Sequence, residues 1–148
     1  MIVIAHNVRS LHNVGALFRS ADAFAVEKLY LTGYTAVPPR KEIHKTALGS
    51  EHVVPWEYQT DIFILLKFLR ENGRSLYGLE TGDSAISLTD KKLISPLALI
   101  LGNEVTGIEK DVQEQLDAII EIPMVGRKKS LNVSVAAGIA MFVLASRS

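Results

Sequence analysis

The 148-residue chain contains no cysteine, one tryptophan and no excess of either charge, with 16 acidic and 16 basic side chains. The lack of cysteine excludes disulfides, thiol nucleophiles, cysteine-ligated zinc and iron–sulfur clusters. The zero formal net charge disfavours a protein that coats nucleic acid through bulk positive charge. With 48% hydrophobic and 22% charged residues, the chain has an ordinary globular composition, and its length suits one domain. We therefore expect a single domain over residues 1–148.

Long hydrophobic runs are also lacking. The first residues have no basic segment of the kind that opens a signal peptide. The most apolar stretch, residues 131–145, is interrupted by Asn132, Ser134 and Gly138, and it is shorter than the ~18 residues of a membrane span. We expect it to form a buried helix, and we expect the chain to be cytoplasmic, with no membrane partner.

Several common catalytic motifs are missing. No G-x-G-x-x-G follows the first apolar run, and neither a phosphate-binding G-x-x-x-x-G-K-[ST] nor a G-x-S-x-G occurs. The four histidines, at positions 6, 12, 44 and 52, do not form a pair at metal-ligand spacing on one helix. Dinucleotide, nucleoside triphosphate, serine hydrolase and zinc chemistry are therefore disfavoured, and no metal is expected.

Short apolar runs alternate with segments of helical periodicity along the chain. The residues at 97–101 are apolar at every position, which is typical of a strand covered on both faces by helices. The sequence therefore predicts an α/β fold with a mostly parallel sheet flanked by helices. Strands are predicted at 2–5, 28–32, 75–80, 97–101 and 118–122, and an irregular segment at 34–57. Helices are predicted at 13–26, 108–116 and 131–146, and another is predicted to be capped by Thr60 and to end near residues 72–73.

Three polar segments follow predicted strands, where open α/β sheets bind ligands. Residues 7–19 include Arg9 and Arg19, whose guanidinium groups match phosphate oxygens. Residues 102–108 place Glu104 beside a buried strand, where a carboxylate needs a partner or a task, and Gly102 would let a ligand approach the backbone. Residues 122–134 form a basic loop before the last helix, with Ser130 as the expected N-cap. Each segment alone also fits an ordinary strand–turn–helix connection, but the three together favour a ligand site.

The same segments resemble, in order, the three motifs of the SpoU/TrmH-type RNA 2′-O-ribose methyltransferases of the SPOUT class. N-V-G at 13–15 through Arg19 resembles motif 1, L-I-L-G-N-E-V-T-G-I at 99–108 resembles motif 2, and I-P-M at 122–124 with S-L-N-V-S-V-A at 130–136 resembles motif 3. The likeness extends over residues 2–145. It implies a C-terminal trefoil knot, a homodimer, and a single SPOUT domain whose motifs use the whole chain without a separate RNA-binding extension.

The resemblance also implies S-adenosylmethionine as cofactor and structured RNA, either tRNA or rRNA, as substrate. The implied reaction methylates a ribose 2′-hydroxyl, with Arg19 activating the hydroxyl. The residues implied to hold Arg19 and the ribose are Asn13, Glu104, Ser130 and Asn132. Cofactor contacts are implied for Leu79, Glu80, Gly102, Asn103, Ile122, Met124, Ser130, Leu131 and Asn132. Two alternatives remain open at this point: a non-catalytic RNA-binding or assembly protein with the same fold, and a metabolic α/β enzyme.

The neutral total charge conceals a division along the chain. Residues 1–50 carry six basic and three acidic side chains, residues 51–122 carry six and 13, and residues 123–148 carry four and none. If the fold brings the two ends together, they form a basic face suited to phosphate contacts. The expected RNA contacts are Arg9, Arg19, Arg40, Lys41, Lys45, Arg127 and Lys128.

Overall fold

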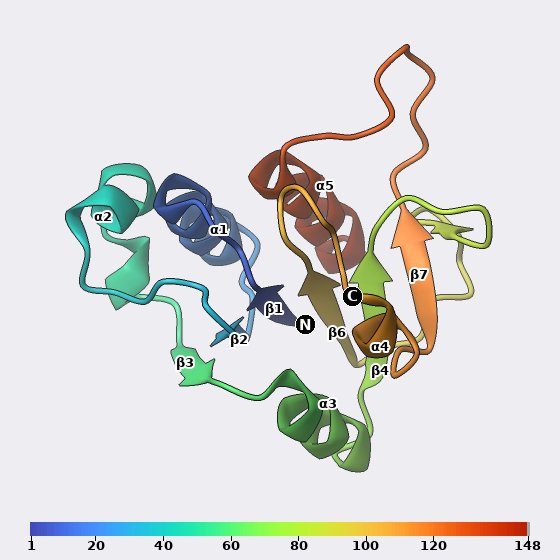
Figure 1. Cartoon of the computed structure of the whole chain (residues 1–148), viewed down its shortest axis with the longest axis horizontal. Helices are drawn as coiled ribbons and strands as arrows, with labels where there is room; N and C mark the ends of the chain where they lie inside the picture. Colours follow the sequence, from blue (N-terminus) through green and yellow to red (C-terminus); the bar gives the residue numbers. More distant parts are fainter. Residues whose placement is uncertain (148) are drawn as a thin grey trace.

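The computed structural model describes residues 1–147, and its centre is one seven-stranded sheet in the order β3-β2-β1-β6-β4-β7-β5 (Figure 1). Every pair of neighbouring strands is parallel, so all the carboxyl ends lie along one edge. The predicted parallel α/β fold is confirmed. The strands are β1 (Ile2–His6), β2 (Lys28–Thr32), β3 (Trp56–Gln59), β4 (Ser75–Leu79), β5 (Ile86–Ser87), β6 (Leu97–Leu101) and β7 (Ala118–Glu121).

The two central strands, β1 and β6, are buried at all five of their positions. They pair with each other in the register Ile2↔Ala98 and Ile4↔Ile100, although about 96 residues of sequence separate them. Apart from His6 at the end of β1, their sequences are wholly apolar, which is explained by helices on both faces of the sheet.

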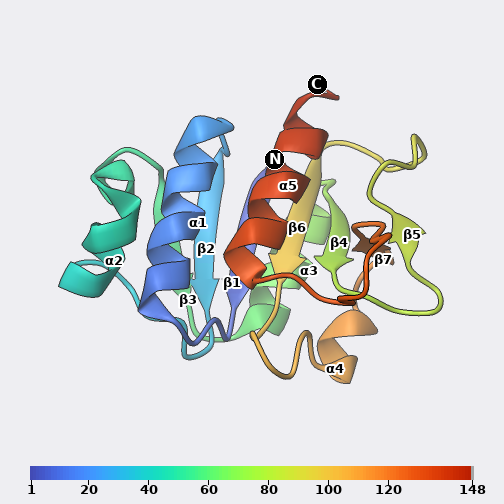
Figure 2. The same ribbon diagram turned by 90° about the horizontal axis from the view of Figure 1, so that it is seen from above.

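The helices divide between the two faces of the sheet (Figures 1 and 2). One face is covered by α1 (Leu11–Ala23) and α5 (Val133–Ala145), with α2 (Lys41–Ala47) and the short 3-10 helix η1 (Ser50–His52) beside α1. The other face is covered by α3 (Ile62–Glu71) and the single turn α4 (Lys110–Gln113). Each face therefore has its own apolar core, one centred on Leu17, Phe18 and Met141 and the other on Leu65, Leu69 and Ile100.

Helix α5 is buried on only one face, through residues such as Ala137, Ala140 and Met141. Val135, Ile139 and Phe142 are exposed, so the prediction of a buried helix holds for half of its surface. Among residues 1–147, none of the helices has both the length and the apolar character that crossing a membrane requires.

The segment predicted as irregular, residues 34–57, in fact contains α2, η1 and the start of β3. Isolated helices as short as α2 are unstable in water, so its sequence carries little local signal. It forms because it packs closely on α1: a Cβ on Gly15 would lie 2.1 Å from Thr46 Oγ1. The two-residue strand β5 was missed because so short a segment also carries little local signal. The helix predicted at 108–116 is only the single turn α4.

Candidate active site

The carboxyl ends of three adjacent strands, β4, β6 and β7, open into a pocket of ≈ 880 Å³. Its walls come from the loops that follow these strands and from the start of α5. The loop after β7 projects away from the sheet before the chain returns to α5 (Figure 1). All nine positions predicted to contact a cofactor line this pocket: Leu79, Glu80, Gly102, Asn103, Ile122, Met124, Ser130, Leu131 and Asn132. The motif spacing did not indicate Thr81, Glu121 and Ala136, which line it too.

The loop after β6 folds back on itself at the floor of the pocket. Asn103 and Gly107 exchange two backbone hydrogen bonds, of 3.1 and 3.0 Å, and the Asn103 side chain accepts from the N–H groups of Val105 and Thr106. A Cβ on Gly102 would lie 2.5 Å from the carbonyl carbon of Gly107. We expected the missing side chain of Gly102 to let a ligand approach. The structure shows that the close approach of the Gly107 backbone already requires a glycine there.

Glu104 is hydrogen-bonded to the segment that joins β1 to α1 and begins that helix. Its carboxylate accepts from the N–H groups of Arg9 and Ser10, both at 2.9 Å, and from Asn13 Nδ2 at 3.0 Å. Burial raises the pKa of Glu104, but the two backbone N–H groups and the Asn13 amide outweigh it and hold the pKa below its ordinary value. Glu104 is therefore an anion that anchors the start of α1.

Asn132 joins the third motif segment to the same group. Its Oδ1 accepts from the N–H groups of Ser134 and Val135, which makes it the N-cap of α5, and its Nδ2 donates to Asn13 Oδ1 at 3.2 Å. The prediction that Ser130 caps this helix was wrong, because α5 begins only at Val133. Hydrogen bonds thus connect one residue from each motif segment, namely Asn13, Glu104 and Asn132.

Arg19 stands apart from these residues. It is exposed on α1, it does not line the pocket, and within residues 1–147 it makes no hydrogen bond or ion pair. Six residues of helix separate it from Asn13, which is about 9 Å along the axis and most of two turns around it. Four of the five predicted catalytic residues are therefore gathered at the pocket rim, and Arg19 lies outside the pocket.

Sequence reasoning also missed a second hydrogen-bond network behind the pocket. Asn7 adopts φ 53°, a conformation that asparagine tolerates better than most residues. Its side chain accepts from the Tyr34 N–H at 3.0 Å and donates to Glu109 Oε1 at 2.8 Å. Asn103 donates to the Asn7 carbonyl and to the Tyr34 hydroxyl. This network fixes the turn after β1 to the loop after β6, and the asparagine directly after a strand was its only sequence signal.

The seven predicted RNA-contact residues are all exposed. Arg40, Lys41 and Lys45 belong to α2, where Arg40 is the N-cap, and Arg127 and Lys128 belong to the loop that precedes α5. In Figure 1 these elements lie on the same side of the sheet as α1 and α5. The fold thus places the two basic ends of the sequence on one side of the sheet.

A parallel α/β sheet with a ligand-sized pocket at the carboxyl ends of adjacent strands defines a protein that binds a small molecule at that edge. Comparison with known proteins identifies the family within this class. The family model of the SpoU rRNA Methylase family matches residues 1–142, and the chain belongs to this family.

Individual relatives agree with this assignment. The chain is 34% identical over 142 residues to the 23S rRNA (guanosine-2′-O-)-methyltransferase RlmB of Vibrio parahaemolyticus, a match that covers 96% of this chain and 57% of that protein. Its fold is similar to that of the A. aeolicus TrmH/SpoU tRNA modifying enzyme, with a TM-score of 0.88 and 30% identity over 99% of this chain and 74% of that chain. The AdoMet-bound rRNA methyltransferase from Sinorhizobium meliloti gives a TM-score of 0.88 and 26% identity over 99% of this chain and 55% of that one. The chain thus spans little more than half the length of the curated relative.

Proposed function

We propose that this chain is an S-adenosylmethionine-dependent methyltransferase that methylates a ribose 2′-hydroxyl in structured RNA, either tRNA or rRNA. The observation that carries the proposal is the pocket at the ends of β4, β6 and β7. It is lined by all nine positions that the family resemblance assigned to the cofactor. Family membership supports the chemistry, and the related structure from Sinorhizobium meliloti contains the same cofactor.

The pocket fits an adenosyl group in size and in character. Its ≈ 880 Å³ lies within the roughly 300–1,000 Å³ usual for cofactor sites. Ile122, Met124 and Leu131 offer apolar surface for a flat ring, while the backbone carbonyl groups of Gly102 and Asn103 offer acceptors at its edge. We assign the cofactor to these residues and to the other pocket positions named above.

The chain's own residues would then orient the substrate. Bound S-adenosylmethionine supplies a methyl group on a good sulfonium leaving group, so the protein needs mainly to align the ribose oxygen and to help remove its proton. Asn13, Glu104 and Asn132 hold the starts of α1 and α5 at the pocket rim, and Ser130 lines the pocket beside them. Arg19, with its cationic guanidinium and fixed set of N–H donors, would stabilise the negative charge that develops on the 2′-oxygen.

Because Arg19 lies away from its own pocket, we infer that it serves the pocket of a second copy in a homodimer. The exposed apolar side chains of Val135, Ile139 and Phe142 follow one another at helical spacing on α5, and the Phe142 ring lies 5.8 Å from that of Phe24. A continuous apolar face of this kind is suited to pairing with another copy. Sedimentation should show a dimer for the wild type and a monomer for Phe142→Asp, and a wild-type monomer at micromolar concentration would overturn the inference.

Two further features belong to the same proposal. We infer that the segment from β4 to α5 forms a trefoil knot, which would fix the three pocket loops around the cofactor. The spatial order β6-β4-β7, in which sequence neighbours are not sheet neighbours, supports it. An RNA substrate of this kind also implies a cytoplasmic location.

The decisive experiment is methyl transfer from labelled S-adenosylmethionine to separated tRNA and rRNA fractions. The wild type should label the 2′-oxygen of one fraction, which identifies the substrate. Arg19→Ala should abolish transfer while calorimetry still detects cofactor binding. Lys92→Ala, which removes an exposed charge outside the motif segments, should leave transfer unchanged. Wild-type turnover by Arg19→Ala would refute the role of Arg19, and a chain that binds no cofactor would refute the proposed function.

A further inference from the structure

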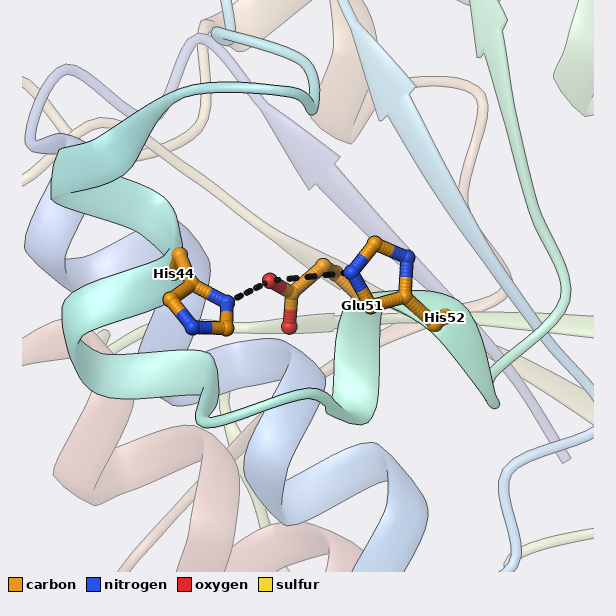
Figure 3. A group of neighbouring side chains, drawn as sticks. All are labelled: His44, Glu51 and His52. Atoms are coloured by element: carbon orange, nitrogen blue, oxygen red, sulfur yellow. Dashed lines mark hydrogen bonds and ion pairs between the residues drawn. The ribbon is translucent and has the colours of Figure 1, made fainter.

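A group of metal-ligating side chains lies outside the pocket, between α2 and η1. His44 comes from the last turn of α2, and Glu51 and His52 come from η1. Figure 3 shows the two imidazole rings on either side of the Glu51 carboxylate. His44 Nδ1 lies 2.5 Å and His52 Nε2 lies 3.8 Å from Glu51 Oε1, and the three ligand atoms all lie within 4.8 Å of one another. We propose that His44, Glu51 and His52 bind a divalent transition-metal ion of the zinc type.

The burial of Glu51 is the first argument for a cation at this position. Its side chain is only 4% exposed, and a buried carboxylate requires compensation. One oxygen accepts from the Gly49 N–H at 2.9 Å, but within residues 1–147 neither a lysine nor an arginine pairs with it. The two histidines are its only ionic neighbours there.

The donor set is the second argument. Two imidazole nitrogens and one carboxylate oxygen form a combination that Zn²⁺ uses in proteins, with a fourth tetrahedral position left for water. Mg²⁺ and Ca²⁺ prefer sites made of oxygen ligands alone. Ligand atoms about 2.0–2.2 Å from a tetrahedral ion lie roughly 3.3–3.5 Å apart, which falls between the separations found in the cluster.

The cluster can reach this geometry with little rearrangement. The side chains of His44 and His52 are 62% and 74% exposed, so their rings can turn without disturbing the core, whereas Glu51 is held in place. An ion between His44 and Glu51 would replace the hydrogen bond between them and would increase the distance between the two ligand atoms by about 1 Å. Residue spacing does not indicate this arrangement, because the three ligands lie on two short helices that only the tertiary structure brings together.

A metal here would clamp α2 and η1 to each other and, through them, to α1. Thr46 of α2 donates its hydroxyl to the His12 carbonyl of α1 at 2.8 Å, and Ser50 of η1 donates to Asp22 of α1 at 3.0 Å. The ion would therefore stabilise a unit that packs on the helix bearing Asn13. We assign it a structural role, which is independent of the proposed methyl transfer.

The test uses the full chain without an affinity tag, freed of metal with a chelator that is then removed. At a Zn²⁺ concentration about 100-fold above Kd, the melting temperature should rise by about 5 °C or more, and Co²⁺ should develop the visible absorption of a tetrahedral site. Mg²⁺ should produce neither effect. His44→Ala and His52→Ala should abolish both effects, and because both rings are exposed these variants should still fold.

The matched control is His12→Ala, which removes an exposed histidine outside the cluster and should retain both responses. If Zn²⁺ produces no stabilisation in the wild type, or if His44→Ala and His52→Ala respond as the wild type does, the proposal is overturned and the group is a hydrogen-bonded cluster alone. Because neither readout involves RNA or S-adenosylmethionine, failure here is distinguishable from failure of the proposed function.

Discussion

Replacing Glu104 by alanine removes three hydrogen bonds that join the loop after β6 to the start of α1. A buried bond to a charged acceptor contributes roughly 1.5–3 kcal/mol, but Glu104 is exposed and water can replace its carboxylate. We therefore take ~0.5 kcal/mol for each bond, within the range of weak hydrogen bonds. The expected loss in the free energy of unfolding is about 1.5 kcal/mol, or a fall of about 3–6 °C in Tm for a chain of this size.

The same change should weaken cofactor binding, because Gly102 and Asn103 at the pocket floor belong to the loop that Glu104 anchors. We expect calorimetry to show a Kd for S-adenosylmethionine about 10-fold higher, which corresponds to about 1.4 kcal/mol. Glu114→Gln is the control, since the Glu114 side chain is exposed and makes no hydrogen bond or ion pair within residues 1–147. Wild-type stability and wild-type affinity in Glu104→Ala would refute the anchoring role.

The pH dependence of this effect has a defined sign. The pKa of Glu104 in the folded chain lies below its ordinary value, so the carboxylate stabilises the fold fully above about pH 4.3. That contribution is lost as the pH falls through the lowered pKa. The difference in unfolding free energy between wild type and Glu104→Gln should therefore be largest near neutral pH and disappear in acid. A difference that persists unchanged at about pH 3 would contradict this account.

Three other substitutions test the fold, two at the site and one at Glu27. Gly102→Ala should cost about 2 kcal/mol in urea denaturation, because its Cβ would meet backbone at 2.5 Å, whereas Gly82→Ala faces open space and lacks this cost; equal midpoints for the two variants would contradict the close approach. Asn132→Ala removes the N-cap of α5 and should cost about 1 kcal/mol, most of which Asn132→Asp should recover; no recovery would place the cost outside the cap. Hydrogen bonds from Arg74 and from the N-terminal ammonium lower the pKa of Glu27 to about 2, so its stabilising effect should be complete above about pH 4.5 and should be lost as the pH falls through about 2. Glu27→Gln should therefore show a shallower loss of stability in acid, and an unchanged acid limb in its denaturation profile would count against the pairing.

The sequence by itself determined the kind of fold and the edge of the sheet at which a site was expected. An apolar residue at every position of 97–101 predicts a strand that is covered on both faces of the sheet. All five residues are buried in the structure. The resemblance of the three segments to the family motifs assigned Ile122, Leu131 and Asn103 to the cofactor, and all three line the pocket. Local pattern showed only that the segments follow strands, and the carboxyl ends of parallel strands share an edge. These properties follow from side-chain periodicity and from strand polarity, both of which are local.

Only the tertiary structure determined which side chains of the site are hydrogen-bonded to one another. Asn13 bonds to Glu104 across 91 residues and to Asn132 across 119, and neither pairing has a periodic or spacing signal. The short helices α2 and η1 exist because α1 supports them, and only their packing brings His44 beside Glu51. The position of Arg19, away from its own pocket, depends on where α1 starts, and Ser10 sets that start as its N-cap. Such features depend on contacts between residues far apart in the chain, whose free energy is realised only when the whole sheet has formed.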